Sequence, residues 1–131
     1  MKNIARFSMT ILSAACVFAA NTASAQEPTK VDSKHYKVVL ENDQVRVLRI
    51  NYGPKEKSVM HEHPTGVVTF LTDSNVKFTL PDGKTVDSIG KAGEVREAPA
   101  GKHLPENMSD KAFEAILVEF KTKPAAAAKT K

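Results

Sequence analysis

The chain has 131 residues, of which 19 are Lys or Arg and 15 are Asp or Glu, and its formal net charge is +4. The basic residues are spread along the chain, and aromatic residues make up only 6% of it. A nucleic-acid partner would require clustered cations and exposed rings for base stacking, so the composition excludes one. The length suits one domain with its own hydrophobic core.

Residues 1–25 have the pattern of a secretory signal peptide. Lys2 and Arg6 precede an apolar run, and an Ala-Ser-Ala cleavage site ends at Ala25. The apolar run is short for a membrane span, so we expect cleavage after Ala25, no stable membrane insertion afterwards, and a periplasmic or secreted product. A retained N-terminal anchor is the alternative. The single cysteine, Cys16, lies in this leader, so the exported chain would form no disulfide.

The rest of the chain divides into three parts. Residues 26–35 are polar, contain a proline, and are expected to form a linker or a loose N-terminal strand. Residues 36–121 consist of short runs rich in β-branched and aromatic residues, separated by turn signals, which predict a β-barrel or sandwich. The expected strands are 36–41, 45–52, 58–63, 67–71, 76–80, 85–87, 93–98 and 113–120. Residues 122–131, rich in alanine and lysine, are expected to be a disordered tail.

Several side chains can be assigned an expected place in such a barrel. Six apolar residues are predicted to form its core: Phe70, Phe78, Phe113, Ile116, Val118 and Phe120. His35 precedes the first strand without an evident partner and is predicted to be exposed to solvent. Three glycines are predicted to stand at barrel corners with positive φ: Gly53, Gly93 and Gly101. Asn107 is expected to tie down a loop.

The sequence His61-Glu62-His63 is the candidate functional motif. Side chains alternate along a strand, so His61 and His63 would point to one face and Glu62 to the other. Neutral imidazole is a common ligand of zinc, iron, copper and nickel, and His103 could add a third imidazole from a neighbouring strand. The alternative is that the histidines line a barrel mouth without a metal.

Residues 36–121 resemble a small single-domain cupin, whose fold is a double-stranded β-helix or jelly roll. The first half of the cupin signature, a glycine followed by His-x-His, is matched by Gly53, His61 and His63. The second half, a glycine, Pro-x-Gly, a histidine and an asparagine, is matched with one residue missing before the histidine by Gly93, Pro99, Gly101, His103 and Asn107. The resemblance implies an all-β jelly-roll barrel, and also a homodimer formed through a barrel face.

The chain departs from the cupin pattern at one ligand position. Where the family carries a glutamate after His-x-His, this chain has Val67 or Val68. The resemblance therefore implies a three-histidine site of His61, His63 and His103, as in cupin-type thiol dioxygenases, instead of the three-histidine-one-glutamate site of oxalate-degrading cupins. Glu106 is a weaker alternative as an additional ligand. The metal could be iron, manganese, copper, nickel or zinc.

Two functions follow from this site. Three neutral ligands leave the charge of a divalent ion uncompensated, which favours an anionic small-molecule substrate at an open position and suggests a dioxygenase-type metalloenzyme. Alternatively, the barrel binds a small ligand or a metal without turnover. An open coordination position would favour the enzyme, and the sequence assigns no catalytic residue beyond the ligands.

Overall fold

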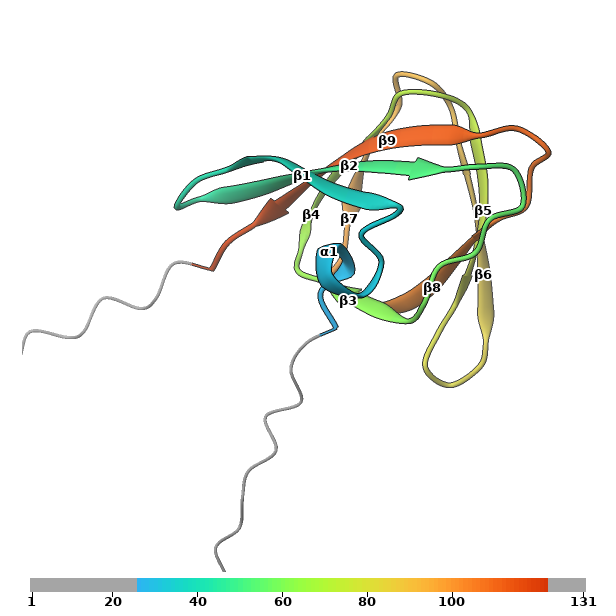
Figure 1. Cartoon of the computed structure of the whole chain (residues 1–131), viewed down its shortest axis with the longest axis horizontal. Coiled ribbons are helices and arrows are strands. Elements are labelled where there is room, and N and C mark those ends of the chain that lie inside the picture. Colours follow the sequence, from blue (N-terminus) through green and yellow to red (C-terminus); the bar gives the residue numbers. More distant parts are fainter. Residues whose placement is uncertain (1–25, 123–131) are drawn as a thin grey trace, which may run out of the picture.

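A computed structural model describes residues 26–122 of the chain (Figure 1). Its elements are α1 (Pro28–Val31), β1 (Tyr36–Glu41), β2 (Val45–Tyr52), β3 (His61–His63), β4 (Gly66–Phe70), β5 (Ser74–Thr79), β6 (Thr85–Gly90), β7 (Val95–Ala98), β8 (Gly101–Asn107) and β9 (Phe113–Phe120). The predicted leader and all but the first residue of the predicted tail lie outside the described residues. In the part that is described, no helix is long and apolar enough to cross a membrane.

The strands form two antiparallel sheets, which confirms the predicted all-β barrel. One sheet has the order β1-β2-β9-β4-β7 and the other has the order β3-β8-β5-β6. The β1–β2 hairpin extends beyond the body of the barrel, with β1 at the edge of its sheet (Figure 1). The expected homodimer stays a prediction.

The core lies between the two sheets, and the prediction of its residues is partly right. Its buried members are Tyr36, Leu48, Ile50, Tyr52, Phe70, Val76, Phe113, Ala115 and Leu117, and Phe78 packs against them. Ile116 and Val118 are only half-buried, and Phe120 is 46% exposed, so placing these three in the core was wrong. The reason is the period of a strand: Phe113 and Leu117 face inward, so the residues at even numbers on β9 face outward.

The N-terminal segment is not the linker or loose strand that we expected. Pro28 begins the short helix α1 and is buried, and the helix lies beside β3 (Figure 1). The backbone N–H of Glu62 donates to the carbonyl of Gln26 over 3.0 Å. His35, which follows the helix, is only 5% exposed, so the prediction of a solvent-exposed side chain was wrong. This segment therefore closes onto the strand that carries His61 and His63.

Of the three corner glycines, only Gly93 has the predicted positive φ, at 83°. Gly53 instead stands where the carboxylate of Glu56 lies against the backbone. The Gly53 N–H donates to Glu56 Oε2 over 2.7 Å, and a Cβ on residue 53 would lie 2.9 Å from Glu56 Cδ. Gly101 has neither a positive φ nor a close neighbour.

Gly66 offers a test of the packing between β4 and β9. A Cβ at this position would lie 2.2 Å from the backbone oxygen of Val118, so Gly66→Ala must displace the backbone of β9. We expect the free energy of unfolding, measured by urea denaturation, to fall by about 1–3 kcal/mol or more. Gly101→Ala is the control, since a Cβ there meets no atom within 4 Å. Equal stabilities of the two variants would contradict this description of the sheet.

Candidate metal centre

The three predicted histidines come together on the paired strands β3 and β8. His61 lies directly opposite His103 in the antiparallel register. One ring nitrogen from each of His61, His63 and His103 lies within 4.8 Å of the other two. His61 is fully buried and His63 is 5% exposed, which confirms that they share the inward face. Glu62 faces away and lies 3.9 Å from Lys102 Nζ.

Hydrogen bonds fix the proton on the outer nitrogen of two of these rings. His61 Nδ1 lies 2.8 Å from the carbonyl oxygen of Val59, and His63 Nδ1 lies 2.6 Å from Glu119 Oε1. Carbonyl and carboxylate oxygens accept, so each Nδ1 must donate its proton, and in a neutral ring Nε2 keeps a free lone pair. This is the usual arrangement of metal-ligating histidines, whose other nitrogen donates to a carboxylate or a carbonyl.

The inner nitrogen of His61 lacks a partner. Its Nε2 is buried and makes no hydrogen bond to any of the described residues. A buried acceptor without a partner costs free energy, and a metal ion that accepts this lone pair would remove that cost. The donor set of three imidazoles and this orphaned nitrogen therefore fit a divalent transition metal.

The surroundings keep two of the three histidines neutral. Burial, helped by the neighbouring His63, lowers the pKa of His61 to about 4. Burial also lowers the pKa of His103 to about 3, and the two other histidines add to the effect. Neutral imidazole is the form that binds a metal, so at neutral pH both rings are ready to act as ligands.

Glu119 is a functional residue that we did not predict. It is 1% exposed, and its carboxylate accepts from His63 Nδ1 and from Arg46 Nε, each over 2.6 Å. Burial raises the pKa of Glu119, but the hydrogen bonds from His63 and Arg46 outweigh this effect and leave that pKa below its ordinary value. Glu119 therefore remains a carboxylate and orients His63. The alternation on β9 could have revealed it, because Glu119 continues the inward face of Phe113 and Leu117.

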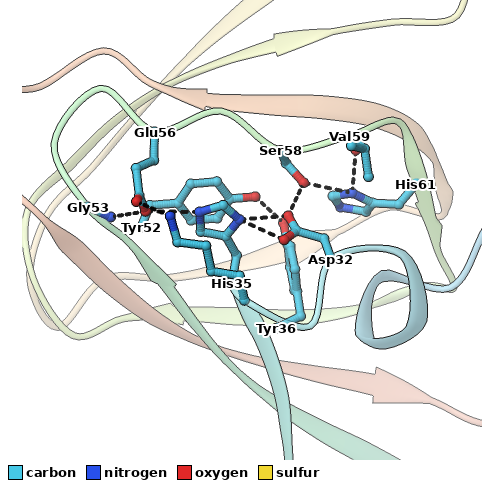
Figure 2. A network of polar contacts seen from close by, with 10 residues as sticks. Asp32, His35, Tyr36, Tyr52, Gly53, Glu56, Ser58, Val59 and His61 are labelled. Atoms are coloured by element: carbon cyan, nitrogen blue, oxygen red, sulfur yellow. Dashed lines mark hydrogen bonds and ion pairs between the residues drawn. The ribbon is translucent and has the colours of Figure 1, made fainter.

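A second polar network supports His61 from the N-terminal segment (Figure 2). His35 Nδ1 lies 2.7 Å from Asp32 Oδ2, and His35 Nε2 lies 2.9 Å from Glu56 Oε2. The hydroxyl of Ser58 donates to Asp32 and lies 3.4 Å from His61 Nδ1. Asp32 thus connects the segment after α1 to the loop that leads into β3.

Glu106, the alternative ligand, does not belong to the cluster. It is an odd number of residues from His103 on β8, so the two side chains point to opposite faces. Its carboxylate lies 3.2 Å from Lys77 Nζ and 3.8 Å from Lys57 Nζ. The hypothesis that Glu106 completes the site was wrong.

A cavity of about 410 Å³ adjoins the cluster. His63 and His103 form part of its wall, and much of the remainder is apolar, including Val68, Phe70, Val76, Phe78, Leu80 and Phe113. Apolar cavities with a few convergent polar groups are typical sites for small molecules.

Solved structures with the same architecture identify the fold. A cupin domain from Bordetella pertussis Tohama I is 27% identical, has a TM-score of 0.62, and is matched over 66% of this chain and 92% of its own. An RmlC-like cupin family protein from Methanocaldococcus jannaschii has a TM-score of 0.53 at 16% identity, over 65% and 77% of the two chains. The chain has the cupin fold. A double-stranded β-helix protein from Klebsiella pneumoniae is also similar, with a TM-score of 0.51 at 21% identity, over 67% and 84%. No protein-family model and no curated protein matches the chain.

The two halves of the cupin signature are physically joined in this chain. Asn107, from the second half, is fully buried and donates to the carbonyl of Gly53, from the first half, over 2.8 Å. It also donates to the carbonyl of Lys111 over 2.8 Å and accepts from the N–H of Ser109 over 3.0 Å. This confirms that Asn107 ties down loops.

The lowered pKa values of His61 and His103 predict an acid-sensitive fold. The ordinary histidine pKa is 6.5. Between pH 6.5 and about pH 4, His61 and His103 therefore bind protons in the unfolded chain but remain unprotonated in the folded protein. The unfolding free energy of metal-free protein should therefore fall from about pH 6.5 to pH 4, by up to about 1.4 kcal/mol per pH unit for each group. Urea denaturation across this range should give a flatter profile for His61→Gln/His103→Gln. Identical profiles would contradict the assignment.

Proposed function

We propose that this cupin-fold protein binds one divalent transition metal through His61, His63 and His103 and holds a small organic molecule beside it, in the periplasm or outside the cell. The buried Nε2 of His61, which has no partner among the described residues, is the observation that carries the proposal. Export is inferred from the leader pattern of residues 1–25.

Three protein ligands leave room for a further one. Within residues 26–122, no other His, Cys, Asp or Glu joins the cluster, and Glu106 is held by lysines on the other face of β8. Even a four-coordinate ion would then keep one position for a small molecule, which is the mark of a catalytic site. A bound ion would supply Lewis acidity or, if it is iron, manganese or copper, dioxygen chemistry. This favours a dioxygenase-type enzyme over a binding module without turnover.

The protein's own residues prepare the site. Glu119 and the carbonyl of Val59 hold protons on Nδ1 of His63 and His61, so that Nε2 of each ring can face the ligand. Arg46 neutralises Glu119, which prevents that buried carboxylate from remaining unpaired. The apolar cavity excludes water from a molecule that lies against His63 and His103.

The metal content of the purified chain tests the proposal. We expect near-stoichiometric metal by mass spectrometry in protein prepared without a histidine tag, and loss of this metal in His61→Ala/His63→Ala. Glu106→Gln is the matched control and should retain the full amount, because its carboxylate binds lysines. A wild-type protein without metal, whose melting temperature no added transition metal raises, would overturn the metal site.

Glu119 should control metal affinity without touching the metal. Glu119→Gln removes the charge that fixes the proton on His63 Nδ1, and we expect metal affinity to fall by about 10- to 100-fold in competition with a chelator. Glu114→Gln is the control, since Glu114 lies on the same strand but binds Arg49 and Asn51 at the surface. Unchanged affinity in folded Glu119→Gln would contradict an orienting role.

A further inference from the structure

The cavity beside the histidines has walls that suit an apolar body. Its volume of about 410 Å³ lies within the usual range for small-molecule sites, about 300–1,000 Å³. Phe78 stands at the histidine end, where its ring centroid is 4.7 Å from that of His103. Val68, Phe70 and Leu80 also belong to the apolar wall. A molecule that reaches the histidines is therefore surrounded mainly by hydrocarbon.

Within residues 26–122, the charged residues of the cavity wall provide no unpaired cation to bind an anionic group. Among the described residues that line the cavity, Arg96 is the one permanent cation, and its guanidinium donates to both carboxylate oxygens of Glu94 over 2.6 and 2.8 Å. Arg96 also lies over the ring of Phe70, 5.3 Å from its centroid. Asp87 and Glu97 line the cavity as well and are exposed to solvent. A second negative charge on a ligand would thus meet carboxylates and an already neutralised guanidinium.

The wall has few neutral hydroxyl groups, and each already makes one hydrogen bond. The hydroxyl of Tyr36 is hydrogen-bonded to that of Tyr52 over 2.8 Å, and both residues are buried. Ser88 accepts from Arg96 over 3.4 Å. A ligand with many hydroxyl groups, such as a sugar, would leave most of them unpaired in this cavity, and each unpaired buried group is costly.

On the basis of the proposed metal site, we infer that the ligand is a small monoanion with an apolar ring or chain as its body and one head group that reaches the histidines. The metal at His61, His63 and His103 would neutralise the head, and the apolar wall would hold the body. Sugars, nucleotides and di- or polyanions are disfavoured by the same contacts. The assignment concerns the class of the molecule that enters the proposed site.

Calorimetric titration of the metal-loaded full chain with simple carboxylates tests this assignment. We expect affinity to rise along the series acetate, butyrate, hexanoate, by a factor of up to about four for each buried methylene. Benzoate and cyclohexanecarboxylate should bind at least tenfold more tightly than acetate, and succinate should bind no more tightly than butyrate. Equal affinities along the series, or a preference for succinate, would overturn the inference.

A pair of variants on β6 locates the binding. Val86 lines the cavity and is 50% exposed, so Val86→Asp should fold and should weaken benzoate binding at least tenfold and acetate binding by a smaller factor, because acetate has no apolar body to contact this wall. Ile89 is 61% exposed on the same strand and is not one of the residues that line the cavity, and Ile89→Asp should bind benzoate as the wild type does. Equal loss in both variants would place benzoate elsewhere and overturn the inference.

Metal content measured on the same samples separates the two claims: protein that binds no metal refutes the proposed function, whereas flat affinities in metal-loaded protein refute the ligand class alone.

Discussion

The pairing of β3 with β8 is the constraint on which the candidate site depends. β3 has only three residues, and a slip of one residue would turn His61 and His63 to the outer face. Bonds on both sides of the strand prevent this slip. In the loop before β3, the N–H of Ser58 donates to the carbonyl of Pro105 over 2.9 Å. Within β3, the N–H of Glu62 donates to the carbonyl of Gln26 over 3.0 Å. The segment that leads into α1 and the loop before β3 thus fix the register that brings His61 opposite His103.

Buried charge around the histidines is arranged in pairs. Glu119 is held between His63 and Arg46, and Asp32 is held between His35 and Ser58. A buried carboxylate without a partner would be strongly destabilising, and here the guanidinium of Arg46 accompanies Glu119 while His35 and Ser58 supply hydrogen-bond partners to Asp32. The orientation of the clustered histidine rings therefore depends on residues that do not line the cavity, among them Arg46 on β2.

Sequence reasoning succeeded where the information was local. The alternation of a strand places His61 and His63 on one face whatever the fold, and the same rule applied to β9 would have identified Glu119 and corrected the placement of Phe120. The prediction that His103 joins His61 and His63 depended on the resemblance to cupins, because no local rule says which strand lies next to β3. His35 was misplaced for a related reason. Its burial depends on how α1 folds back onto the barrel, which is a long-range contact with no periodic signal in the sequence.

The substitution of the cupin glutamate connects the metal centre with the character of the cavity. Val67 and Val68, which stand where the family carries that residue, belong to β4, and Val68 packs against the core and lines the cavity. An apolar side chain at this position leaves the proposed ligand set without a negative charge, and Val68 adds hydrocarbon to the cavity wall. Both effects act in the same direction: an ion bound as proposed would keep more of its positive charge for an anionic head group, and the space beside it would suit an apolar body. The departure from the signature is therefore consistent with a change of ligand class more than with loss of the site.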